Sequence, residues 1–229
     1  MLNDSPVGHE DVAEQLQILT TEHWSLLATR SLTASEGLSR VTIFLAILSG
    51  AVIALALVAQ ADRFGPTFIS IAIPLLLVVL FAGHATISRL NALNRDDYRW
   101  VVGKNRLRHA SIELHPELER HLTASPYDDL QGALRTLGID DPMAGRGVGS
   151  VPHLLQTLPG MLTVIVAAVG GTIGALLAAV IGIPWQGAVA AAGGGFLLVL
   201  GSMAAWGRRA VTQPSPGLEP RFPSPGDDR

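Results

Sequence analysis

Cysteine is absent from this 229-residue chain, and that absence removes three classes of site. A disulfide framework, a thiolate metal centre and a cysteine nucleophile all need the missing thiol. Charge is also scarce, because Asp, Glu, Lys and Arg make up 15% of the residues, against roughly a quarter in typical soluble domains. The low charge and a mean hydropathy of +0.38 both indicate a membrane protein.

Four long stretches contain no Asp, Glu, Lys or Arg: Val41–Gln60, Pro66–Ile87, residues 155–183 and Trp185–Trp206. About twenty apolar residues let an α-helix cross the hydrocarbon core of a bilayer, so each stretch is long enough to span it. The loops inside the first and the last pair are too short for anything but a turn. We therefore expect an all-α integral membrane protein with two transmembrane helical hairpins, four spans in all, and amphipathic cytosolic helices.

The rest of the pattern divides the chain into five segments. They are a cytosolic amphipathic helix in residues 1–32, a first transmembrane hairpin in 33–87, a cytosolic helical segment and linker in 88–150, a Gly-rich second transmembrane hairpin in 151–207 and a disordered Pro-rich tail in 208–229. Thr33 and Glu36 have the spacing of a capping box, which predicts an elbow near Ser31 and a new helix start. No strong breaker follows the second span before Pro116, so we expect one long helix to leave the membrane.

A short helix is predicted in the central segment. Ser125 would be its N-cap, Pro126 its first residue and Asp128 an acidic N3 residue, and Gly138 would close it. Residues 140–150, rich in glycine, indicate a flexible linker between the two hairpins.

Small residues recur every four positions within the spans, a spacing that lets two helix backbones approach closely in lipid. The predicted helix-packing residues are Ala46, Gly50 and Ala54 in the first span, Gly170, Gly174, Ala178 and Gly182 in the third, and Gly187, Ala191 and Gly195 in the fourth. These rows favour contacts between spans, so we expect a homo-oligomer or a membrane-protein partner.

Arginines flank the spans unevenly, with Arg40, Arg89, Arg208 and Arg209 on one side and Arg63 on the other. The positive-inside rule then predicts that both termini are cytoplasmic. Basic residues also cluster directly after the second span, where anionic lipid head groups are a better partner than nucleic acid. The predicted head-group contacts are Arg89, Arg95, Arg99, Lys104, Arg106 and Arg108.

His84 is the one ionisable side chain within a span. It is a candidate for a proton-linked or gating role, and packing or hydrogen bonding near the helix end is the alternative. His109, His115 and His121 lie near glutamates, but their six-residue separations place them on different sides of a helix. We expect no metal site, no cofactor and no catalytic residue.

Two phrases, HWSLLATRSL at His23–Leu32 and NRLRHASIELHPELERH at Asn105–His121, resemble uncharacterised four-span integral membrane proteins of actinobacteria. The resemblance covers about the first half of the chain and implies no activity. We expect a non-enzymatic interaction or assembly module of the bacterial inner (cell) membrane.

An oligomeric pore or small-solute or ion channel is the alternative, and a membrane enzyme is a third. The polar side chains available to line a pore are Thr42, Ser49, Ser70, His84, Thr163 and Thr172.

Overall fold

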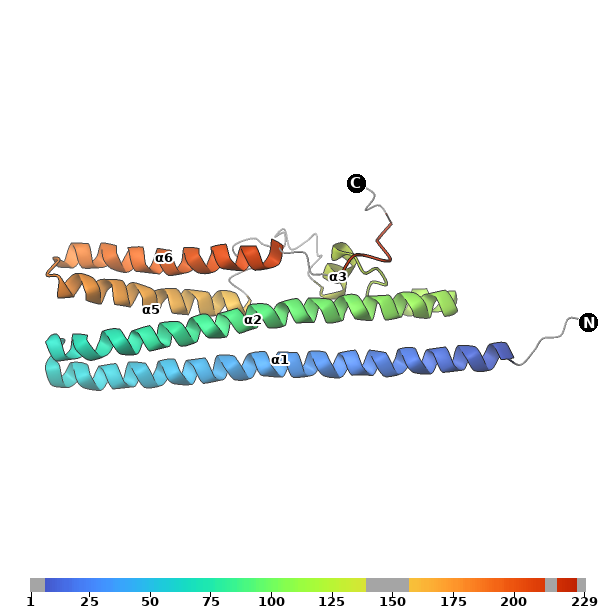
Figure 1. Cartoon of the computed structure of the whole chain (residues 1–229), viewed down its shortest axis with the longest axis horizontal. Helices are drawn as coiled ribbons and strands as arrows, with labels where there is room; N and C mark the ends of the chain where they lie inside the picture. The colour runs from blue at the N-terminus through green and yellow to red at the C-terminus, as the bar shows by residue number, and fades with distance from the viewer. Residues whose placement is uncertain (1–6, 139–156, 213–217, 226–229) are drawn as a thin grey trace, which may run out of the picture. The chain divides into compact units, whose positions relative to one another are not determined.

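A computed structural model describes residues 7–138, 157–212 and 218–225. Its elements are α1 (Val7–Asp62), α2 (Pro66–Leu114), the 3-10 helix η1 (Pro116–His121), α3 (Leu130–Thr136), α5 (Leu158–Val180) and α6 (Trp185–Thr212) (Figure 1). All regular structure in these three ranges is helical, which confirms the all-α class. Helices α1, α2, α5 and α6 are each long and apolar enough to cross a membrane, as a multi-pass membrane protein requires.

Helix α1 runs without interruption through the expected elbow near Ser31, so the capping-box prediction is wrong. The Thr33 hydroxyl donates to the Thr29 carbonyl oxygen of the same helix at 2.9 Å. The Glu36 carboxylate instead accepts hydrogen bonds from Arg89 at 2.9 Å and from Arg40 at 2.8 Å. Both side chains therefore have partners that leave the backbone free to continue as helix.

Helix α2 confirms the prediction of one long helix, since it extends from Pro66 to Leu114 and contains Pro74. It ends directly before His115, because the residue that precedes a proline is disfavoured in the helical region. The following η1 turn carries no buried residue.

The chain forms two compact units, and α1 and α2 contribute to both. Unit 1 comprises residues 1–35, 94–148 and 214–229, and unit 2 comprises residues 36–93 and 149–213. These boundaries differ from the expected segments, since α1 and α2 are each divided between the two units, while α5 and α6 belong to unit 2 alone. The predicted linker at 140–150 lies outside the described residues.

Unit 2 has one apolar core to which all four long helices contribute. Phe44 of α1, Val79 of α2 and Val166 of α5 are fully buried in it, and Val199 and Met203 of α6 are nearly so. The contact between α5 and α6 is made by backbone at Gly170, Gly171 and Gly174.

Unit 1 has a smaller core around Val101, Val102 and Ala133, against which Leu218 packs from the end of the chain. Arg30 of α1 and Asp97 of α2 form a two-bonded ion pair, with N–O distances of 2.6 and 3.0 Å. Leu26 is buried beside Gly103 of α2. These contacts hold the polar halves of α1 and α2 together.

The short helix begins later than predicted, at Leu130. Its N-cap is Asp129, whose carboxylate accepts a hydrogen bond from the Gly132 amide at 2.8 Å, and Ser125 and Pro126 precede it. Gly138 follows the helix in the left-handed region with φ of 69°, as predicted for its closing residue.

Candidate functional site

Asp128 and Asp129 of unit 1 form a buried polar site in which both carboxylates accept several hydrogen bonds. Each residue is 1% exposed, although aspartate is rarely buried unless its charge is paired. Both carboxylates bind the same partner, a segment near the end of the chain that comprises residues 218–225. We call the pair and its surroundings the two-aspartate site, and the bound residues the tail segment.

Asp128 binds the middle of the tail segment by its backbone and its side chain. Its carboxylate accepts hydrogen bonds from the Arg221 amide at 2.9 and 3.0 Å and from the Phe222 amide at 2.8 Å. Its own amide donates to the Phe222 carbonyl oxygen at 3.1 Å. Asp128 therefore fixes both the position and the direction of the bound segment.

Asp129 binds the next part of the segment while it caps α3. Its carboxylate accepts a hydrogen bond from the Ser224 amide at 3.1 Å and another from the Ser224 hydroxyl at 2.9 Å. One carboxylate thus serves the first turn of α3 and the tail segment together, so their stabilities are coupled.

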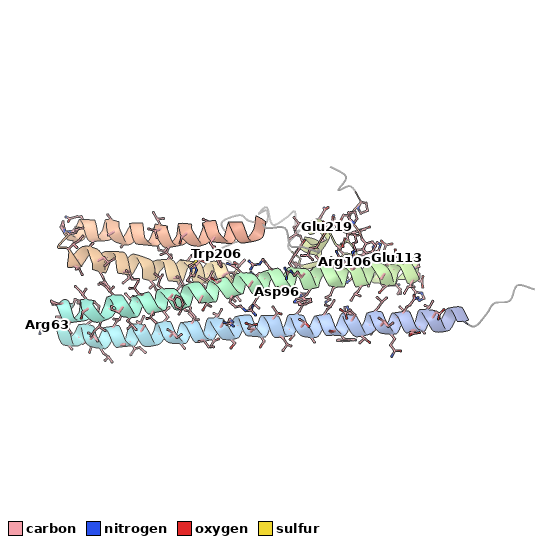
Figure 2. The ribbon with its side chains drawn as sticks, in the orientation of Figure 1. Arg63, Asp96, Arg106, Glu113, Trp206 and Glu219 are labelled. Carbon is pink, nitrogen blue, oxygen red and sulfur yellow. The ribbon has the colours of Figure 1, made fainter. Side chains whose placement is uncertain are left out.

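Helix α2 supplies the other contacts of the site. Arg106 donates to the Asp128 carboxylate at 2.7 Å and to the Glu219 carbonyl oxygen at 2.8 Å, and Figure 2 shows Arg106 and Glu219 close together. The His109 ring stacks on the Phe222 ring with centroids 3.9 Å apart. The buried Asn105 donates to the Tyr127 carbonyl oxygen at 2.7 Å, which positions the loop that carries the two aspartates.

The site keeps Asp128 ionised. Burial by itself would raise the pKa of this carboxyl group, but hydrogen bonds from the Arg221 amide, the Arg106 guanidinium and the Phe222 amide more than offset that effect and lower the pKa. A charged acceptor of this kind makes stronger hydrogen bonds than a neutral one.

The tail segment departs from the predicted disordered tail. Residues 218–225 are held by the two-aspartate site, and α6 extends through the first residues of the expected tail to Thr212. Few bulky apolar residues are present there, which is why composition indicated disorder. The partner is a pair of carboxylates far away in sequence, and only the sequence Asp128-Asp129 before a short helix marks it.

Most of the basic residues that were predicted to contact head groups make contacts within the chain or are buried. Arg89 binds Glu36, and Arg108 donates to the Asn105 side chain at 2.7 Å. Arg106 belongs to the two-aspartate site, and Lys104 is only 8% exposed. Arg95 is exposed, and Arg99 contacts Asp96 at 3.5 Å with about half of its side chain exposed.

His84 is exposed on α2 and packs against Trp206 of α6, with ring centroids 5.6 Å apart. That contact agrees with the packing alternative for this histidine. Of the predicted pore-lining hydroxyls, those of Thr42, Ser70, Thr163 and Thr172 donate to a carbonyl oxygen of their own helix, at 2.7 to 3.0 Å. The protons of these four hydroxyl groups are therefore donated within their own helices.

The predicted helix-packing residues fall into two groups. Ala46, Gly50 and Ala54 are exposed on α1, and no atom lies within 4 Å of a Cβ added at Gly50. The third and fourth spans differ, because Gly170, Gly174, Ala191 and Gly195 lie in the α5–α6 contact. Ala178 is buried, Gly182 has φ of 72° at the turn, and Gly187 lies against Ile183.

Metal-binding geometry is not found among the described residues, where no three His, Asp or Glu side chains are grouped to hold an ion. His109 lies 3.7 Å from Glu113, and His115 lies 3.0 Å from Glu117, so each histidine is paired with a different glutamate. No protein-family model, curated protein or solved structure matches this chain.

Proposed function

We propose that the chain is a multi-pass protein of the bacterial inner membrane and acts, without catalysis, as an assembly module. Its spans form two transmembrane hairpins, and both termini are cytoplasmic. The exposed apolar face of α1 carries the proposal. Of the 18 most apolar consecutive residues, 11% are buried within the chain in α1 and 6% in α6, against 39% in α5. Lipid or another helix must cover that face.

A second helix fits this face because its small residues remain uncovered. In the α5–α6 contact of the same chain, glycines bring two backbones together, and Ala46, Gly50 and Ala54 offer a comparable row on α1. Ile43 and Ile47 beside the row are 57% and 41% exposed and would pack around a partner helix. A second copy of this chain supplies such a helix, so we propose a homo-oligomer formed through α1.

The test is the mass of the particle in mild detergent and in nanodiscs. We expect the wild-type protein to contain two or more chains and Gly50→Leu to contain one, because the added side chain fills the row. Gly193→Leu is the matched control, since nothing lies within 4 Å of a Cβ added there. A wild-type protein that stays a single chain at all concentrations would refute assembly, and solute flux in liposomes would favour the pore instead.

Single cysteines in the cysteine-free chain test the orientation. Ser35→Cys and Glu113→Cys should react with an impermeant reagent only from the cytoplasmic side, and Phe64→Cys only from outside. The exposed Arg95 and Arg99 are the remaining head-group candidates, at about 1 kcal/mol for each well-placed charge.

A further inference from the structure

Each backbone N–H group of residues 220–224 in the tail segment donates a hydrogen bond to a carboxylate of the two-aspartate site. Pro220 and Pro223 carry no N–H group, so between residues 220 and 224 only three backbone donors exist: those of Arg221, Phe222 and Ser224. All three donate to Asp128 or Asp129. No donor in this stretch needs water, which is the condition for burying a peptide backbone without a penalty.

Side chains add recognition to this backbone match. Phe222 stacks on His109, and the Ser224 hydroxyl donates to Asp129 in a position where Ser224 is 5% exposed. Leu218 packs against the core of unit 1 at one end of the segment. The site therefore contacts a leucine, an aromatic residue and a serine that stand at fixed spacing among prolines.

We propose that the two-aspartate site is a peptide-binding site for proline-rich segments, and that the chain's own tail segment is its ligand in cis. The site binds the segment reversibly, as a receptor binds a peptide, and becomes available when the tail leaves. This inference is independent of assembly through α1, because every residue that carries it belongs to unit 1.

The tail segment follows α6 after a short connection, and the length of this connection affects how fully the segment occupies the two-aspartate site. Five residues separate the end of α6 at Thr212 from Leu218. Short tethers give a bound segment an effective concentration on the order of millimolar. An added peptide must exceed this value to displace the tail of the wild-type protein.

The experiment uses the full chain in nanodiscs and a fluorescent synthetic peptide of residues 217–226. Phe222→Pro in the chain removes one donated amide and the stacked ring, but leaves the receptor residues unchanged. We expect the peptide to bind this variant, and to require at least about tenfold more peptide for half-saturation of the wild-type chain. Pro225→Ala is the control, because Pro225 is exposed and donates nothing.

A nitroxide on Pro225→Cys reports directly whether the tail is docked. The label should be immobile in the wild-type background and mobile with Phe222→Pro. An immobile label in the variant would refute the amide match, and absence of peptide binding with a mobile label would show that the tail docks only as part of the fold. Equal binding by both chains would refute occupancy in cis. Oligomer size should not change, which separates this test from that of assembly.

Discussion

Two helix–helix contacts in unit 2 are built in opposite ways. Between α1 and α2 the large Phe44 ring is fully buried, and a Cβ added at Gly83 of α2 would lie 3.0 Å from it. Between α5 and α6 the glycines leave room for backbone, and a Cβ at Gly195 would lie 2.6 Å from the Gly170 carbonyl oxygen. The α1–α2 contact depends on a large buried side chain, and the α5–α6 contact depends on the absence of side chains at its glycines.

The difference shows when a row of small residues identifies a contact. Helices α5 and α6 both offer small residues at matching heights, so Gly170, Gly171, Gly174 and Gly195 each meet backbone of the other helix. Helix α1 has a similar row, yet Phe44 and Ala51 face the core and the row remains exposed. Spacing alone therefore identifies a surface that can pack closely, and the partner decides whether it does.

Removing volume from the α1–α2 contact should have the largest effect. Phe44→Ala deletes a ring that is fully buried and leaves a cavity, at a cost of about 3 kcal/mol in the free energy of unfolding. Val52→Ala, at a position of α1 that is 56% exposed, is the control and should change little. Thermal unfolding in nanodiscs measures both, and equal losses would mean that Phe44 does not hold α1 to the core.

Adding volume to the α5–α6 contact should have the next largest effect. A Cβ at Gly174 collides with the Ala191 carbonyl oxygen, so Gly174→Leu must separate the two backbones, at a cost of about 2 kcal/mol. Gly193→Leu on the exposed side of α6 serves as the comparison. If both variants melt alike, the glycine contact contributes nothing to stability.

An ion pair distinguishes the α1–α2 contact further. Hydrogen bonds from Arg89, and then from Arg40, lower the pKa of Glu36 from 4.5 to about 2. The folded protein therefore binds this proton less readily than the unfolded chain, and the stabilisation is complete above pH 4.5 and lost as the pH falls to about 2. We expect Glu36→Gln to melt below wild type at pH 7 and the two to converge toward pH 2. A constant difference would exclude the pairing as its source.

The turns should show the smallest effect, with opposite signs. The α1–α2 turn places Arg63 at φ of 49°, where a side chain is strained, and the α5–α6 turn uses Gly182 at φ of 72°. Gly182→Ala should destabilise by about 1 kcal/mol. Arg63→Gly should stabilise the fold by roughly 0.5 kcal/mol, because glycine adopts this φ without strain. The gain is small since glycine also has more conformational freedom in the unfolded chain. Melting temperatures that move in the same direction would contradict this reading.

Local composition was sufficient to predict the four apolar helices, because length and lack of charge are properties of each stretch alone. The elbow near Ser31 was wrong since Glu36 bonds to Arg89, which is 53 positions away. The two-aspartate site could not be found for the same reason, as Asp128 and Arg221 are 93 positions apart. The end of α2 directly before His115–Pro116 was predicted correctly, because a proline acts on the residue next to it.

The prolines of the tail segment give docking a simple signature in hydrogen–deuterium exchange. Only the Arg221, Phe222 and Ser224 amides of residues 220–224 carry an exchangeable backbone proton, and docking protects all three. Their shared protection from exchange therefore measures the fraction of time that the segment spends outside the site, without a label or a substitution. These three protons report a single event, the opening of the two-aspartate site.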